Sequence, residues 1–350
     1  MRRRQDVKNE RDSAGAIKAG RKLFGDDSAA IGLSMILYMI LLNGLTLLLR
    51  AAARPLAGVP PNIHQIISGL AEVLAYTLTF VFTVLFMSKG AVRPAGFSNP
   101  GTLFAALTVP LFFVTFLLLN YINIFVKELL SYIGVFGVSP SIIPPKSGAS
   151  LLVFLLMYVL LPPVLEELLF RGVLLFRLRR FGDGFAVALS SFIFALMHHN
   201  LVSMPGIFLT GLLFGYLTIL SGSLVPAMLM HLLNNSIAVL FLWFERYKTP
   251  AEMNMLASAV FLAGITSFAL ICMYAVVFML QRREPRQSDA AVLTARLFQS
   301  RNTQIPARIA FARAFRSGWM IAFTVIAVFI TLYMEFLPRL MEQATKFRGS

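Results

Sequence analysis

The chain has 350 residues, of which 58% are hydrophobic and only 13% are charged. A soluble domain is usually about half apolar and a quarter charged, so this composition argues against a soluble protein. The net charge of +15 could indicate nucleic-acid binding, but Lys and Arg gather in residues 2–22 and 282–316, beside apolar runs. Basic residues placed there orient membrane helices and attract anionic lipid head groups. We therefore expect contact with anionic lipid head groups and no nucleic-acid partner.

Nine apolar runs follow one another along the chain, and each is a candidate membrane helix. About 20 apolar residues let a helix cross a hydrocarbon core of roughly 30 Å, and a helix satisfies its own backbone polar groups there. In order, the runs are residues 29–53, 65–88, 102–126, 149–176, 184–199, 204–221, 224–244, 256–281 and 318–336. They predict an all-α fold, a polytopic transmembrane helical bundle of eight or nine membrane helices in a multi-pass protein of the cell membrane.

Two features of the runs bear on topology. The fifth and sixth runs are short for a crossing, so each can tilt or stop partway. The basic loops place the N-terminus and the turn Arg177–Arg180 in the cytoplasm. If all nine runs cross, the C-terminal tail lies outside.

Ionisable side chains away from the ends of the runs are concentrated in one region, together with two amides next to the last of them. A charge at the bilayer centre costs about 2.5–3.5 kcal/mol on the lenient insertion scale, so such residues are functional candidates. In order, they are Glu166, Glu167, Arg171, His198, His199, His231, Asn234 and Asn235.

Helix geometry groups some of these residues. Glu167 and Arg171 are four residues apart and share a helix face, so they can form an ion pair. Glu166 is rotated by about 100° from Glu167 and is left free. Glu166 and His198 each lie about 21 Å along a straight helix from the same basic turn, so we expect them to meet. Counted in the same way along its own helix, His231 lies at a smaller depth in the membrane than Glu166 and His198, unless the sixth segment is shortened or re-entrant.

Pro162 and Pro163 precede the two glutamates. Proline inside a helix removes a backbone hydrogen bond and kinks it. In a membrane, such a break is tolerated where it faces protein or a water-filled cavity. Either a cavity beside the glutamates or an ordinary packing kink fits this pattern.

Three motifs occur in order within these runs: E-E-x-x-F-R-G at Glu166–Gly172, F-x-x-x-H at Phe194–His198 and H-x-x-x-N at His231–Asn235. Together they resemble the CPBP family of intramembrane proteases, which contains the CAAX prenyl endopeptidases and the bacteriocin-processing and immunity proteins. The resemblance covers residues 150–245. It implies an intramembrane endopeptidase that acts on a membrane-embedded or lipidated peptide.

The resemblance also implies which residues do the chemistry. Glu166 is the expected general base and holds the attacking water together with His198. His231 and Asn235 are the expected hydrogen-bond donors to the tetrahedral oxyanion. The supporting residues are Glu167 and Arg171. The spacing of the second motif selects His198 over His199, although His199 remains an alternative.

The catalytic type is open at this point. Glu166, His198 and His231 are a possible zinc set of two histidines and one carboxylate, but the same residues also suit a metal-free mechanism. We expect no cofactor and keep zinc as the alternative. No Asp lies within an apolar run, which argues against an aspartyl protease.

Two other classes of function compete with the peptidase. A non-catalytic scaffold or bacteriocin-immunity-type protein could use the same fold, with the polar residues locking helices together. A proton-coupled transporter is a third possibility. Paired broken helices in two related halves would indicate that function, and the sequence shows only one such break.

Several placements follow from these hypotheses. Glu166, His198, His231 and Asn235 should face one cavity, which should open at the inner membrane face beside Arg177–Arg180. Glu72 and Glu335 lie near the ends of their runs and are expected at the membrane interface.

The chain is thus expected to comprise six segments. They are a basic cytoplasmic N-terminus (1–28), three transmembrane helices (29–148), a CPBP-like catalytic core (149–245), a further transmembrane helix (246–281), a basic interfacial linker (282–317), and a C-terminal transmembrane helix with its tail (318–350).

Overall fold

The computed structural model describes residues 2–53, 61–88, 96–135, 144–146, 148–281 and 307–348, and within these ranges the only regular elements are helices. In chain order, they are α1 (Arg2–Ala53), α2 (Pro61–Ser88), α3 (Thr102–Ser131), α4 (Gly148–Leu155), η2 (Leu156–Leu160), α5 (Leu161–Glu167), η3 (Leu168–Leu175), α6 (Phe176–Leu178), η4 (Arg179–Phe181), α7 (Asp183–Leu196), α8 (Met204–Ser221), α9 (Val225–Tyr247), α10 (Pro250–Gln281), α12 (Ala307–Ala314) and α13 (Gly318–Arg348).

The predicted membrane architecture is confirmed. Among the described residues, 8 segments are long and apolar enough to cross a bilayer, and they coincide with eight of the nine predicted runs. The remaining run, the fifth, forms α7, which has 14 residues and is therefore only about 21 Å long. The chain is a multi-pass membrane protein with an all-α fold.

Large apolar side chains cover much of the outer surface. Phe125, Leu152 and Phe329 are each at least 65% exposed. In water such a surface would be an aggregation hazard, whereas in a bilayer it faces lipid tails. The buried core is correspondingly small and is built around η3 and α7, which α1 and α13 pack against.

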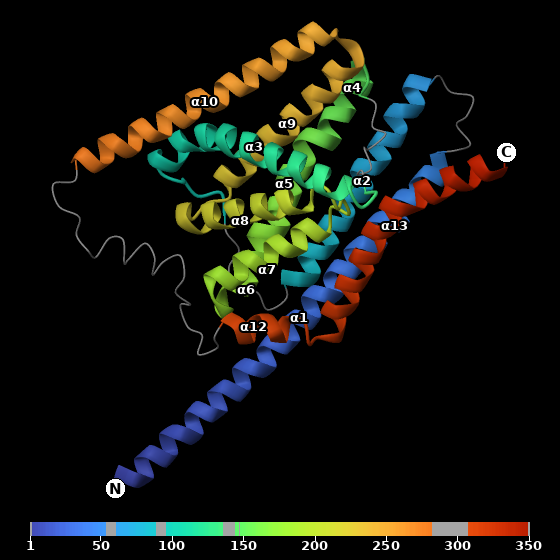
Figure 1. The fold of residues 1–350 in the computed structure, drawn as a ribbon. Coiled ribbons are helices and arrows are strands. Elements are labelled where there is room, and N and C mark those ends of the chain that lie inside the picture. Colours follow the sequence, from blue (N-terminus) through green and yellow to red (C-terminus); the bar gives the residue numbers. More distant parts are fainter. Residues whose placement is uncertain are drawn as a thin grey trace.

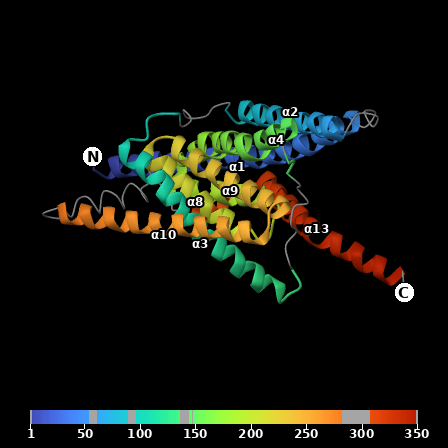
Figure 2. The ribbon, with the colours of Figure 1, turned by 90° about the horizontal axis from the view of Figure 1, so that it is seen from above.

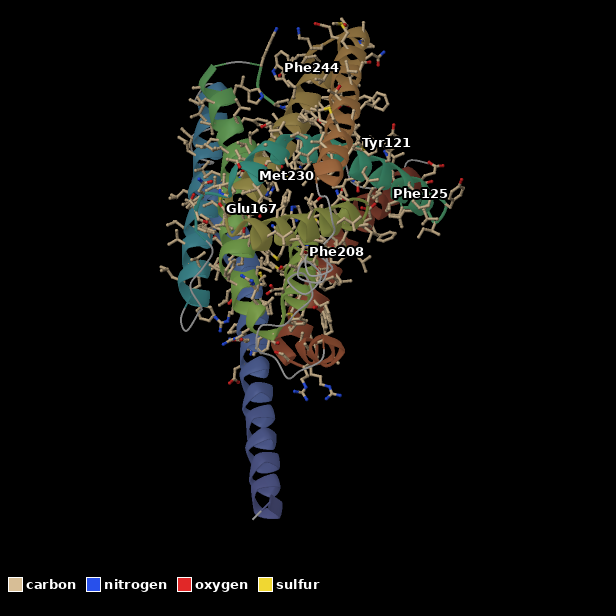
Figure 3. The ribbon with its side chains drawn as sticks, turned by 90° about the vertical axis from the view of Figure 1, so that its left-hand side faces the viewer. Tyr121, Phe125, Glu167, Phe208, Met230 and Phe244 are labelled. Carbon is tan, nitrogen blue, oxygen red and sulfur yellow. The ribbon has the colours of Figure 1, made fainter. Side chains whose placement is uncertain are left out.

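Helices α1, α2 and α13 lie side by side, with α2 and α10 on opposite sides of the bundle (Figures 1 and 2). Helix α8 runs across the bundle rather than along it (Figures 1 and 3). The sixth predicted run is therefore oriented differently from its neighbours, as its short length allowed.

The fourth predicted run is one long helical path whose hydrogen-bond pattern changes along its length. Segments η2 and η3 are π-helical and flank α5, which carries Pro162 and Pro163 in its first turns and ends at Glu167. A π-helical turn is wider than an α-helical turn and is common at functional sites. At the prolines, the structure thus has a change of helix type where a kink was expected. This change alters the faces of the helix on which Glu166 and Arg171 lie.

Helices α1 and α13 run in the same direction, so their N- and C-terminal ends lie at opposite ends of the bundle (Figure 1). This arrangement is compatible with the expected topology. Part of the predicted basic linker, residues 282–306, lies outside the described residues, and its end forms α12. The side chains of the basic stretch 2–22 are likewise outside the described part.

A buried carboxylate joins α1 to the basic turn after η3. Asp27 is 3% exposed, and its Oδ1 lies 3.1 Å from Nη2 of Arg177. Its other oxygen pairs with Arg180. Because Asp27 is shared by two cations, it fixes the first membrane helix against the segment that carries the glutamates.

Close approach of α7 and α8 depends on Gly211. A Cβ atom placed there would lie 2.8 Å from Cβ of Ser191. Overpacking of this kind typically costs about 1–3 kcal/mol. We expect Gly211→Ala to lower the thermal unfolding temperature of the purified protein in detergent. The matched control is Gly44→Ala in α1, where no atom lies within 4 Å of the added methyl group; it should be neutral or stabilising, since Ala is the better helix former. Equal effects of the two changes would contradict the packing argument.

Candidate active site

Glu166 lies at the centre of the polar cluster, and its two oxygens face different partners. Oε1 accepts a hydrogen bond of 2.6 Å from the hydroxyl of Tyr76 in α2. Oε2 lies 4.0 Å from Nε2 of His198 and 4.0 Å from Nε2 of His231. Oε2 is buried and has no hydrogen-bond partner among the described residues. One oxygen is therefore fixed, and the other is free to bind a small polar molecule between the two imidazoles.

Glu167 is fully buried and accepts two hydrogen bonds at one oxygen. Its Oε1 lies 2.8 Å from Nη1 of Arg171 and 2.9 Å from Nδ1 of His231. The ion pair expected between Glu167 and Arg171 is thus present, with side-chain exposures of 0% and 1%. Because the same oxygen also holds His231, the pair orients an imidazole of the cluster.

Arg171 is held by more than its carboxylate partner. Its Nη2 donates to the carbonyl oxygen of Gly211 at 3.3 Å. The guanidinium lies over the rings of Phe194 and Phe214, at 4.4 Å and 5.4 Å from their centroids. Cation–π contacts of this kind are strongest where water is excluded. The arginine therefore ties η3, α7 and α8 together directly beneath the cluster.

The two neighbouring histidines 198 and 199 point to different places. Nδ1 of His198 lies 2.7 Å from the carbonyl oxygen of Phe194, one turn earlier, and its ring lines the larger cavity. His199 adopts a left-handed backbone with a φ of 48° and contacts the backbone of Ala327 in α13. The structure therefore brings His198, and not His199, to Glu166.

The hydrogen-bond partners also fix where the imidazole protons are. A carbonyl oxygen only accepts, so Nδ1 of His198 carries a proton. A carboxylate held by Arg171 also accepts, so Nδ1 of His231 is protonated as well. In a neutral ring the opposite nitrogen is then an acceptor. Nε2 of either histidine can donate only when that ring carries both protons.

Two cavities meet at this cluster. The larger, of about 870 Å³, is lined by His198, His231 and Asn235 and by parts of α3, α8, α9 and α10. The smaller, of about 650 Å³, lies between α1, α2 and the η2–α5 segment and is lined by Glu166 and Tyr76. The expectation of one shared cavity is therefore only partly met. Three of the four residues line the larger cavity, whereas Glu166 lines the smaller one.

The larger cavity is lined along α9 and not by the basic turn. Its lining follows α9 from His231 to Phe241 and includes no residue of the turn 177–180. This stretch leads toward Phe244, which lies at the opposite end of the molecule from the start of α1 (Figure 3). The opening at the inner membrane face, beside Arg177–Arg180, stays a prediction.

Two further carboxylates, Glu72 and Glu335, lie near the ends of their apolar spans. Glu335 is only 3% exposed, and Glu72 lines the smaller cavity. Their position at the membrane interface stays a prediction.

The cluster as it stands does not match a zinc site. Zinc ligands lie about 2.0–2.2 Å from the ion, so ligand atoms are roughly 3.3 Å apart. Glu166 Oε2 is 4.0 Å from both imidazole nitrogens, and no group of three His, Cys, Asp or Glu residues in the described part of the chain is arranged to hold a metal. Binding zinc would require these side chains to close together.

The comparison with known families confirms the resemblance seen in the motifs. The family model of the type II CAAX prenyl endopeptidase Rce1-like proteins matches residues 148–237. These are CAAX protease-like hydrolases of the CPBP family. No curated protein and no solved structure matches the chain. The matched segment includes all four expected catalytic residues and both supporting residues.

Tyr76 lies outside the matched segment and was not anticipated from the sequence. A tyrosine in an apolar helix carries no motif, and its partner Glu166 is 90 residues further along the chain. The sequence offers one indication of a polar face on α2: Glu72 and Tyr76 are four residues apart, so they lie on the same side of this helix.

Proposed function

We propose that this chain is an intramembrane endopeptidase that hydrolyses a peptide bond in a membrane-tethered or lipidated peptide. The observation that carries the proposal is the position of Glu166 Oε2, 4.0 Å from Nε2 of both His198 and His231. A water molecule at about 2.8 Å from an oxygen and a nitrogen fits between atoms separated by that distance. The separation of these atoms thus matches a water molecule that bridges the base and an imidazole.

The chemistry follows from these positions. Glu166 Oε2 takes a proton from the water as its oxygen attacks the carbonyl carbon of the substrate. Neutral His198 accepts the second water proton as a hydrogen bond at Nε2, which turns the water lone pair toward the larger cavity. When the C–N bond breaks, Glu166 returns its proton to the leaving nitrogen. One water is consumed for each bond cleaved.

The oxyanion formed in this step needs donors on the side of the larger cavity. Asn235 lines that cavity and can donate through its amide. His231 donates through Nε2 when its ring carries both protons, because Nδ1 already donates to Glu167. Donors held in a dry site contribute several kcal/mol to such a step.

The substrate class follows from the larger cavity. Its walls carry many aromatic and aliphatic side chains, including Phe116, Ile124 and Phe261, together with amides such as Asn120. Apolar walls suit a lipid chain or a hydrophobic side chain, and amides suit an extended peptide backbone. The family match points the same way, because its members act on prenylated peptides.

The test is cleavage of a defined peptide by the purified protein in liposomes. A peptide carrying a C-terminal lipid should be cut faster than the same peptide without it, as measured by mass spectrometry. We expect activity to survive a strong chelator. If a chelator abolished activity and zinc restored it, the protein would still be a peptidase, but the metal-free mechanism would be contradicted. The absence of cleavage for every lipidated and unlipidated peptide would favour the scaffold.

A further inference from the structure

We propose that the water consumed in hydrolysis reaches Glu166 through the smaller cavity, and that Tyr76 is a positioning residue that holds the Glu166 carboxylate at the inner end of this route. This inference rests on the proposed peptidase function. It involves α1 and α2, which lie outside the segment that matches the family.

The first support is the location of Glu166. It lines the smaller cavity and is not among the residues that line the larger one. The groups proposed to contact the substrate oxyanion, His231 and Asn235, line the larger cavity, as does His198, which holds the water together with Glu166. The base is therefore reached from one side and the oxyanion donors from the other.

The second support is a set of polar side chains among the mostly apolar walls of the smaller cavity. Its walls carry the side chains of Asn43 and Thr46 from α1, Glu72 and Tyr76 from α2, and Tyr158 from η2. Water occupies buried space when the space is roomy and offers two to four polar partners. A volume of about 650 Å³ is ample for several water molecules, each with a share of about 30 Å³.

The third support is a chain of hydroxyls that ends on the base. Tyr76 donates to Glu166 Oε1 at 2.6 Å, and the hydroxyl of Tyr38 in α1 is hydrogen-bonded to Tyr76. The rings of Tyr38 and Tyr76 meet edge to face, with centroids 6.5 Å apart. The carboxylate is thus fixed through one oxygen, while Oε2 is directed between the imidazoles.

The need for a separate route follows from the substrate itself. A lipidated peptide bound in the larger cavity covers His198 and Asn235 and displaces water from that side. A second entrance lets a new water molecule reach Oε2 while the peptide stays bound. The two-sided placement of Glu166 provides this geometry.

The first experiment changes the positioning residue. Tyr76→Phe removes the hydroxyl and keeps the ring. Loss of a hydrogen bond to a charged group should lower kcat by roughly 10- to 100-fold, and KM should stay unchanged because Tyr76 does not line the larger cavity. The matched control is Tyr216→Phe in α8, which should keep both constants. An unchanged kcat, or a rise in KM alone, would overturn the role of Tyr76.

The second experiment blocks the route. In a Cys272→Ser background, Thr46→Cys is modified with methanethiosulfonates of increasing size, and cleavage of the lipidated peptide is measured. The kcat should fall progressively with label size at constant KM. The control is Ile40→Cys, a 61% exposed position of the same helix, where labels should have no effect.

The outcomes separate the route from the function. If unlabelled Thr46→Cys cleaves the peptide and large labels leave kcat intact, the water route is wrong and the peptidase stands. If labels raise KM instead, the smaller cavity binds substrate and the route is again wrong. If the unlabelled protein and its parent cleave nothing, the proposed function itself fails.

Discussion

Glu166→Gln should lower hydrolysis of a lipidated peptide by about 10²–10⁴-fold, the usual contribution of a general base. Glutamine keeps the size of the side chain, and its carbonyl oxygen can still accept the 2.6 Å hydrogen bond from Tyr76. What it loses is the ability to take a proton from water beside His198 and His231. The measurement is single-turnover cleavage by purified protein in liposomes.

Two controls show whether a loss of activity comes from the missing base rather than from misfolding or from the loss of any carboxylate. The variant should keep the thermal unfolding temperature and elution volume of the parent in detergent. Glu252→Gln, which alters an exposed carboxylate paired with Lys248, should keep full activity. Undiminished cleavage by Glu166→Gln would eliminate the proposed base. A cellular phenotype that survives the change would instead favour the scaffold.

Arg171→Ala should destabilise the fold strongly. Removing one partner of a buried ion pair typically costs about 3–5 kcal/mol, because the remaining charge is left buried and uncompensated. Here the remaining group is Glu167, with 0% exposure, and the contacts to Phe194 and the Gly211 carbonyl are lost as well. We expect a lower yield of folded protein and a large drop in unfolding temperature.

The chain offers a matched control with the same spacing. Arg179 pairs with Asp183 four residues later, at 2.9 Å, but its side chain is 22% exposed. Its partner Asp183 is 7% exposed; because this pair is less buried than Arg171 and Glu167, Arg179→Ala should have a smaller effect. If Arg171→Ala folded as well as Arg179→Ala and lost only activity, Arg171 would belong to the catalytic machinery instead.

Much of the fold was predictable because lipid imposes a simple rule. A spanning segment must be long, apolar and helical, so the nine runs identified the helices of the described chain almost completely. The path of α8 was not predictable. Its short length allowed a tilt or a partial crossing, but its direction depends on contacts with α3, α7, α9 and η3, which the sequence does not reveal.

The candidate site was predictable where its geometry is local. The pairing of Glu167 with Arg171 follows from a spacing of one helical turn, and the approach of Glu166 to His198 followed from equal depth in two helices. The partner of Glu166 in α2, Tyr76, was missed, because no pattern in the sequence relates it to a residue 90 positions away. The prolines were the only sequence signal for the π-helical segments that flank α5.

A single oxygen, Oε1 of Glu167, accepts from both Arg171 and His231, and this sharing constrains how such a protein can change over evolutionary time. A descendant that abandoned the proposed hydrolysis could exchange Glu166 with little harm to folding. It could not exchange Glu167, because Arg171 would then be stranded among aromatic rings inside the bilayer. Among related chains, loss of the first glutamate with retention of the second would therefore mark those that have become pseudoenzymes and kept only the architecture.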